Sequence, residues 1–279
     1  MLAVALSLLA SACWGVADFT GGLQSRRVPV VVVLAIVEGV GLLAFLVVIA
    51  IIGEPLPGTR AILYAIGAGT AGAVALGCFY RALAIGTMSI VAPISSTGVA
   101  LPVIVGVASG DRPSLLVSLG LATAVTGVLL ASREQHDDAE QAAAGRAAIW
   151  LALVAALGFG SYFVFSDVAA DSSVPWLLVF SRALIVPVLI AVALVRRAPA
   201  PARASLLVLA LAGLLDVSAT GLYGLANTKG ALSVVSVVGA LYPVATVLLA
   251  RVILGERIRP VQQAGVAAAM VGVALIATG

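Results

Sequence analysis

The sequence predicts an all-α membrane protein in which ten transmembrane helices form two inverted five-helix repeats around a central cavity. Three observations support this fold class. The chain is 62% hydrophobic and 10% charged, which leaves too few polar side chains to cover a water-soluble globule of 279 residues. Its apolar residues fall into runs of membrane-spanning length. The two halves of the chain also match each other at a nearly constant offset.

The predicted helices follow from the gaps between the apolar runs. A helix needs roughly 20 apolar residues to cross a bilayer, and gaps marked by proline, glycine and charge separate the runs. Most gaps are short, so no extramembrane domain fits between the helices. The run around Cys13 is interpreted as a retained first helix rather than a cleaved signal, because no basic residue precedes it. The ten helices are expected at 2–22, 29–52, 61–80, 87–109, 114–132, 147–169, 174–195, 204–226, 231–254 and 261–278.

A polar segment, residues 133–146, separates the first five helices from the last five. At an offset of 144 or 145 residues, glycines and charged residues of the first half coincide with those of the second. The matches include Trp14-Gly15 with Phe159-Gly160, Gly110-Asp111-Arg112 with Gly255-Glu256-Arg257, and Gly120 and Gly127 with Gly265 and Gly272. We therefore predict a first repeat at 1–132, a linker at 133–146 and a second repeat at 147–279.

A repeat with an odd number of helices requires its two copies to enter the membrane in opposite directions. The arginines agree with this inversion, because most of them follow helices 1, 3 and 5 in the first half but helices 7 and 9 in the second. Inverted repeats are typical of secondary transporters. The 12 acidic and 15 basic residues nearly balance and lie in short gaps, so no nucleic-acid partner is expected.

Four charged residues are placed at membrane depth by the predicted helices: Asp18, Glu38, Arg182 and Asp216. A charge costs at least ~2.5 kcal/mol there, so each should face protein or a water-filled cavity and have a partner. Glu38 falls opposite Arg182 in the repeat, and we predict a buried ion pair between them that fixes the two halves. Two alternatives stay open for Glu38: a neutral carboxyl that loads and releases a proton, or a side chain that snorkels from a displaced helix.

Polar residues form two stripes at helical spacing. One stripe contains Ser7, Ser11, Trp14 and Asp18, and the other contains Asp216, Thr220, Tyr223 and Asn227. Hydroxyl groups alone would indicate helix–helix hydrogen bonds. Because each stripe also holds a carboxylate and an aromatic residue with a polar edge, we favour a cavity wall that binds substrate. Asp216 is the expected proton carrier, with Asp18 as the alternative.

Two prolines are expected in the middle of predicted helices, Pro93 in the fourth and Pro243 in the ninth. A proline inside a helix removes a backbone donor and frees a carbonyl oxygen. That carbonyl could bind substrate, or the helix could flex at this point. Both prolines are therefore candidates for the transport site.

Three segments resemble the EamA family of the drug/metabolite transporter superfamily. They are CWGVADF from Cys13, ALAIGTMSIVAP from Ala82 and, most specifically, ANTKGALSVVSVVGALYPVATVLLARVILGERIRP from Ala226. The similarity extends over essentially the whole chain. It implies ten helices, a central cavity between helices 1–4 and 6–9, an outer scaffold of helices 5 and 10, and export of small molecules by alternating access. Arg182 also resembles the family's arginine seven residues after a proline, whereas Glu38 departs from that pattern.

The orientation in the membrane is left open by the sequence. The family usually places both termini in the cytoplasm. That topology would leave only Arg60, Arg112 and Lys229 in the cytoplasmic gaps, which conflicts with the usual excess of positive charge there.

The predicted function is a secondary transporter of small metabolites or drugs, expected to export its substrate and to be coupled to protons. Its expected location is the cell membrane, of the bacterial inner or plasma type, and no cofactor or metal is expected. A passive channel or a structural membrane subunit is the alternative. An intramembrane enzyme fits less well, because His136, the only histidine, lies in the polar linker and no HExxH motif is present.

Overall fold

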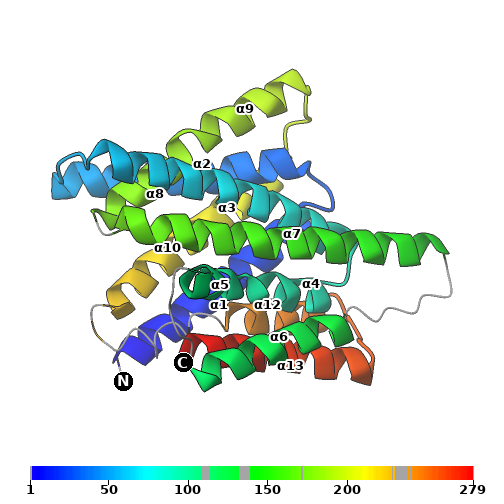
Figure 1. Ribbon diagram of the computed structural model, residues 1–279. Helices are drawn as coiled ribbons and strands as arrows, with labels where there is room; N and C mark the ends of the chain where they lie inside the picture. The colour runs from blue at the N-terminus through cyan, green and yellow to red at the C-terminus, as the bar shows by residue number, and fades with distance from the viewer. Residues whose placement is uncertain are drawn as a thin grey trace.

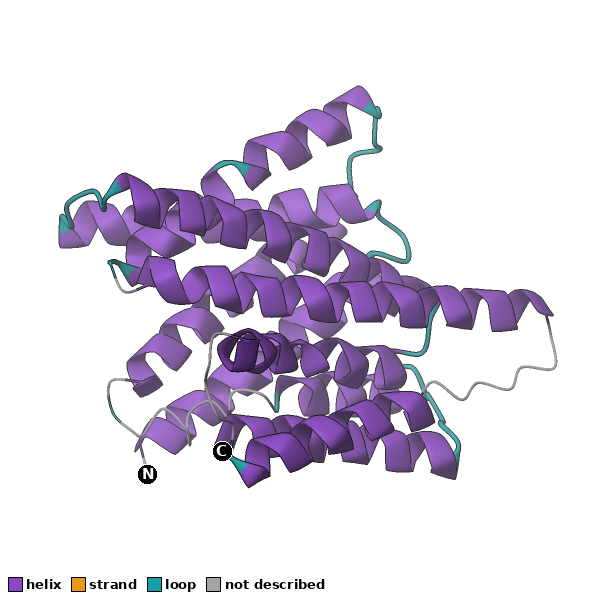
Figure 2. Ribbon diagram, in the orientation of Figure 1, coloured by secondary structure: helices purple, strands orange, loops and turns teal. Residues whose placement is uncertain are grey.

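A computed structural model of the chain describes residues 2–108, 114–131, 139–170, 172–227, 229, 238 and 241–278. The regular elements of these residues are all helical (Figures 1 and 2). They are α1 (Leu2–Gln24), α2 (Val30–Ile52), α3 (Thr59–Ile85), α4 (Met88–Ser96), the 3-10 turn η1 (Thr97–Val99), α5 (Ala100–Ala108), α6 (Leu115–Ala131), α7 (Ala139–Ala170), α8 (Val174–Ala183), α9 (Ile185–Val195), α10 (Arg203–Asn227), α12 (Tyr242–Ile253) and α13 (Pro260–Thr278).

Within the described residues, six helical segments are long and apolar enough to cross a bilayer. They are Leu2–Gln24, Val30–Ile52, Thr59–Ile85, Ala143–Ala170, Val174–Val195 and Arg203–Tyr223. Shorter apolar helices cover Met88–Pro102, Leu115–Leu130, Tyr242–Ile253 and Pro260–Ile276. The all-helical class is thus confirmed for the described residues, whereas the count of ten spans stays a prediction.

Two predicted helices are interrupted rather than continuous. The seventh, expected at 174–195, breaks at Leu184 between α8 and α9. Pro187 explains the break, because it has no N–H for the carbonyl of Ala183 four residues earlier and its ring crowds that carbonyl. The fourth, expected at 87–109, changes to the 3-10 turn η1 between α4 and α5. There Pro102 leaves the carbonyl of Gly98 without a helical partner in the same way.

Two helix boundaries also differ from those predicted by five residues or more. α7 begins at Ala139 instead of 147, because the alanine-rich end of the predicted linker continues the helix. α3 continues past residue 80 to Ile85. Of the ninth predicted helix, expected at 231–254, the structure describes residue 238 and residues 241–254. Residues 231–237 and 239–240 lie outside the described residues, as do residues 133–138 of the linker.

The predicted repeat is visible in a pair of equivalent glycine contacts. A Cβ on Gly15 of α1 would meet the carbonyl oxygen of Tyr242 at 2.5 Å, and a Cβ on Gly160 of α7 would meet the carbonyl oxygen of Gly98 at 2.5 Å. Gly160 lies 145 residues after Gly15, and Tyr242 lies 144 residues after Gly98. Each half therefore supplies the glycine for one contact and the carbonyl for the other, as the offset in the sequence indicates.

The predicted outer scaffold of helices 5 and 10 corresponds to α6 and α13. These two helices lie side by side along one edge of the bundle, at the bottom of Figure 1. A Cβ on Gly127 would meet the backbone of Ala269 and Gly265, and a Cβ on Gly120 would meet that of Gly272. The matching glycine spacing thus lets the two backbones approach closely.

α4 lies in the interior of the bundle. All nine residues of α4 are buried, and α3, α7 and α12 pack against it. α1 packs along α10, and α2 crosses α8, α9 and α10. Both chain ends lie at the same end of the bundle, while α9 diverges at its upper edge (Figure 1). The charged residues predicted at membrane depth lie on α1, α2, α8 and α10 and therefore meet inside this arrangement.

Candidate functional site

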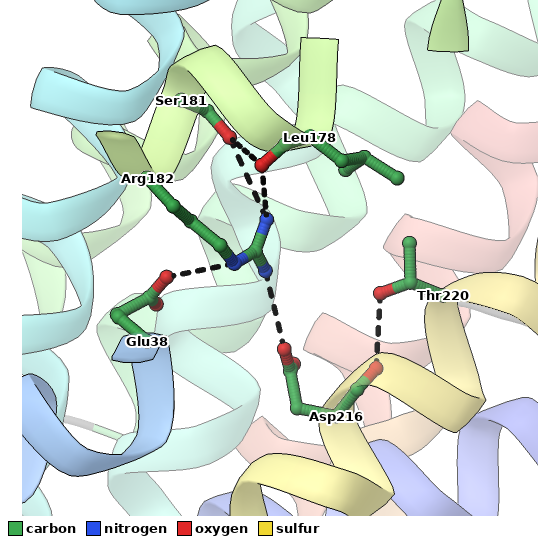
Figure 3. Close-up of polar contacts among 6 residues, drawn as sticks. All are labelled: Glu38, Leu178, Ser181, Arg182, Asp216 and Thr220. Carbon is green, nitrogen blue, oxygen red and sulfur yellow. Dashed lines mark hydrogen bonds and ion pairs between the residues drawn. The ribbon is translucent and has the colours of Figure 1, made fainter. Parts of the chain in front are cut away.

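The centre of the candidate site is the guanidinium group of Arg182, in the last turn of α8. It is nine-tenths buried, with 10% of the side-chain surface exposed. Nη1 donates to the backbone carbonyl of Leu178 at 3.3 Å and lies 3.5 Å from the hydroxyl of Ser181 (Figure 3). These contacts orient the fork so that Nε and Nη2 point away from α8, toward α2 and α10.

The predicted contact between Glu38 and Arg182 is confirmed. Oε2 of Glu38 lies 3.0 Å from Nε of Arg182, although Nε makes no well-aligned hydrogen bond, so the contact is primarily an ion pair. Gly41, three residues after Glu38 on α2, leaves room for the Arg182 side chain, because a Cβ on Gly41 would lie 2.8 Å from Nε of Arg182. The ring of Phe45 covers the guanidinium with its centroid 5.5 Å from Cζ.

Asp216 of α10 is a second carboxylate partner of Arg182, which the sequence analysis did not predict. Oδ2 of Asp216 accepts from Nη2 at 3.3 Å (Figure 3). One guanidinium therefore bridges α2, α8 and α10. A single arginine can do this because its five N–H donors diverge in a fixed plane.

The two predicted polar stripes face each other where α1 packs along α10. The Trp14 side chain is hydrogen-bonded to Asp216, and its ring lies 5.5 Å from that of Tyr223 at an angle of 49°. Thr220 is turned back on its own helix, since its hydroxyl donates to the backbone carbonyl of Asp216 at 3.0 Å. The Asn227 side chain lies outside the described residues. Trp14, Asp216 and Tyr223 are thus brought together.

Asp18 lies one turn after Trp14 on α1. Electrostatic interactions connect it with Asp216, Tyr80 of α3 and Tyr242 of α12. No ion pair or hydrogen bond joins its carboxylate to another residue in the part of the chain that the structure describes. Asp18 is therefore close to the Arg182 network without belonging to it.

Three tyrosines complete the site, and the sequence analysis missed all of them. Tyr80 interacts electrostatically with all three carboxylates, Tyr162 of α7 with Arg182, Asp216 and Glu38, and Tyr242 with Asp18. A usable signal was present, because a tyrosine in an apolar run needs surroundings that satisfy its hydroxyl. Periodicity within one helix could not reveal them, since the three lie on three different helices.

The two candidate prolines are separated by their structural positions. Pro93 lies inside α4 and is fully buried, as expected for a helix interior. Pro243 was predicted in mid-helix, and this is wrong: it lies in the first turn of α12. An N–H in that position has no partner within the helix, so the missing donor frees no carbonyl there. Pro243 instead follows Tyr242, whose side chain interacts with Asp18.

The carboxylates of the site keep some contact with solvent-accessible space. The side chain of Asp216 is 28% exposed and that of Glu38 is 16% exposed, although both lie near the middle of their helices. No group of three His, Cys, Asp or Glu residues within the described ranges could hold a metal ion. The arrangement is suited to reversible binding of a solute or a proton. The central cavity itself stays a prediction.

Comparisons with known proteins follow the same division into halves. The model of the EamA-like transporter family matches residues 1–133 and 146–278. One similar solved structure, described only as a crystal structure of a protein, superposes on this chain with a TM-score of 0.64. The match covers 98% of this chain and 96% of the other at 16% sequence identity, so it supports the fold alone. We found no match among proteins of curated function.

Proposed function

Because the chain belongs to the EamA-like transporter family, we propose that it is a secondary transporter that exports small molecules by alternating access and is coupled to protons. The chain is a multi-pass membrane protein with several apolar helices of spanning length. We place it in the cell membrane of a bacterium, with the two five-helix repeats alternating around Arg182. Its family is one of transporters, which makes a small molecule its expected substrate.

The observation that carries this proposal is the sharing of Arg182 between two carboxylates on different helices. Glu38 on α2 and Asp216 on α10 both contact one guanidinium, and both remain partly accessible. If one carboxylate takes up a proton, Arg182 still keeps the other as its partner. A proton can therefore enter and leave without stranding a buried charge, which is a requirement for coupling at this depth.

Asp216 is the proposed coupling group because it also contacts Trp14 across the α1–α10 interface. A proton on Asp216 would weaken its ion pair with Arg182 and change the contact between α1 and α10. Substrate and proton could then compete for the same region, which is the simplest means of exchange. Asp18, one turn away on α1, is the alternative coupling group.

Transport by the purified protein in proteoliposomes tests the proposal. The substrate would first be sought by comparing the metabolites in the medium of cells that overexpress or lack the protein. We expect saturable movement of that solute, driven by a pH gradient. In Asp216→Asn, we expect normal insertion and exchange without a gradient, but no gradient-driven accumulation.

Two results would contradict the proposal. Flux that rises linearly with solute concentration would indicate a passive channel. Unchanged gradient-driven transport in both Asp216→Asn and Asp18→Asn would exclude both residues as coupling groups. Glu54→Gln is the matched control, because it removes a carboxylate in the turn after α2, away from the Arg182 network.

A further inference from the structure

The centre of the bundle holds more negative than positive charge. Among the described side chains there, the three carboxylates of Asp18, Glu38 and Asp216 accompany one guanidinium, that of Arg182. Three negative charges and one positive charge leave a formal charge of −2 when all four groups are ionised. Uncompensated charge is strongly disfavoured away from water. Positive charge must therefore come from outside the protein, as protons or as a bound cation.

Asp18 is the carboxylate left without compensation. Arg182 is already engaged by Glu38 and Asp216, whereas the groups that interact electrostatically with Asp18 are a second carboxylate and two tyrosines. Neither tyrosine carries positive charge. Among the described groups that interact with Asp18, one is negative and none is positive, so a cation placed beside it would be attracted by both Asp18 and Asp216.

The surroundings of Asp18 favour an organic cation over a metal ion. A Cβ on Gly21 would overlap the ring of Tyr80, which shows how closely this ring lies against α1 beside Asp18. Trp14 and Tyr223 supply two further rings, 5.5 Å apart, next to Asp216. Aromatic faces attract organic cations. By contrast, the carboxylates are not grouped as metal ligands anywhere in the described ranges.

We propose that the transported solute is an organic cation, whose positive group pairs with Asp18 and whose apolar part lies against Trp14 and Tyr223. This inference rests on the proposed transport function and names its substrate class. Arg182 does not contact the solute but holds Glu38 and Asp216 in place. In the absence of solute, protons compensate the same charge, so a cation and protons replace one another at the centre.

Equilibrium binding of tetraphenylphosphonium to the purified protein tests this proposal. The probe is permanently charged, so its binding changes with pH only through groups of the protein. We expect saturable binding that weakens as the pH falls, because protons then occupy the carboxylates of Asp18, Glu38 and Asp216. The other titratable groups around these carboxylates are Arg182 and the three tyrosines of the site. 2-Phenylethylammonium should displace the probe, whereas 3-phenylpropionate, an anion of similar size, should not.

Variants of Asp18 make the test specific. Loss of one close charge partner should weaken probe binding about tenfold or more in Asp18→Asn, while Asp18→Glu should retain most of it. Glu54→Gln, outside the site, should bind as the unaltered protein does. The gel-filtration profile and thermal midpoint of each variant show whether it is folded. The competition experiment needs no variant, so it remains decisive even if Asp18→Asn does not fold.

Equal displacement by the anion, or full binding by folded Asp18→Asn, would overturn the inference. The proposed function fails separately. Saturable exchange of a neutral or anionic solute without probe binding would keep the transporter and remove the cation. Probe binding without movement of any cation across the proteoliposome would keep the site and remove transport.

Discussion

Arg182 is the residue on which the centre of the molecule depends. It contacts carboxylates from two other helices and a carbonyl of its own helix. Removing either carboxylate leaves the guanidinium with one anionic partner, whereas removing the guanidinium leaves two carboxylates without a cationic partner. The roles of Glu38 and Arg182 are therefore unequal, although the sequence suggested a simple pair.

We predict that Arg182→Gln destabilises the protein more than Glu38→Gln does. A buried charge without its partner costs about 3–5 kcal/mol, whereas loss of one of two partners costs about 1–2 kcal/mol. The free energy of unfolding in mixed micelles, followed by circular dichroism, measures both. Equal losses would show that Asp216 does not compensate Arg182 when Glu38 is neutral.

Gly41 offers a matched test of the geometry at Arg182. In Gly41→Ala, the new methyl group would lie 2.8 Å from Nε, so the guanidinium must move away from Glu38. We expect a loss of about 1–3 kcal/mol, together with impaired transport. In Gly39→Ala, the methyl group would lie 3.9 Å from Val186, which is ordinary contact. This control should be neutral or more stable by up to about 1 kcal/mol, because alanine favours the helix; similar effects of both changes would contradict the geometry.

Among the elements, α4 is connected to the second half of the chain through Glu256. Its carboxylate accepts hydrogen bonds from the backbone N–H groups of Met88 at 3.0 Å and Ser89 at 2.9 Å. Arg26, just after α1, lies 4.0 Å from the same carboxylate. Glu256 follows Gly255, whose φ of 65° lies in the left-handed region just after the end of α12. The turn between α12 and α13 thus caps a helix of the first half.

We predict that Glu256→Ala loosens this end of the bundle. Two N–H groups at the start of α4 lose their acceptor, and the loss of a helix cap costs about 1 kcal/mol. A cysteine at Thr87, in a background without Cys13 and Cys78, should react faster with a water-soluble maleimide. Arg257→Ala is the control, since Arg257 is exposed beside Glu256. If both variants react at the unaltered rate, Glu256 does not close this end.

At the scale of the whole molecule, the cationic residues are concentrated at one end. The turns after α1, α9 and α12 and the start of α10 all lie at the end opposite the chain termini. In the described residues, these segments contain Arg26, Arg27, Arg196, Arg197, Arg203, Arg257 and Arg259. At the other end, the described residues include Arg60, in the first turn of α3, and Lys229, just after α10.

This asymmetry predicts that the arginine-rich end is cytoplasmic and both termini are outside, the reverse of the orientation implied by the family resemblance. Each basic residue gains about 1 kcal/mol near the anionic cytoplasmic leaflet, and arginine in short loops favours the inside. Alkaline phosphatase fused at Gly279 should be active, and a fluorescent protein fused there should be dark. Fusions in the turn at Arg197 should give the opposite result, an inactive phosphatase and a bright fluorescent protein. Reversed signals at both sites would contradict the predicted orientation.

The sequence by itself determined the class of fold and the residues that need an explanation. Apolar runs indicate helices because the bilayer must be crossed by segments that satisfy their own backbone. The offset between the halves marked Gly15 and Gly160 as equivalent positions, and likewise the paired glycines of α6 and α13, and the structure gives these glycines matching close contacts. Depth alone marked Asp18, Glu38, Arg182 and Asp216, because a charge in an apolar run requires a partner.

Only the tertiary structure decided which partner each of these charges has. The helical period gives the face of a helix, but not the neighbour that this face meets or the height at which they meet. Arg182 therefore could be assigned to Glu38 through the repeat, whereas its bond to Asp216 depends on where α10 lies relative to α8. The tyrosines around Asp18 and the cap formed by Glu256 likewise come from helices far apart in the chain. Such contacts are set by the packing of whole helices, and no local pattern of residues contains them.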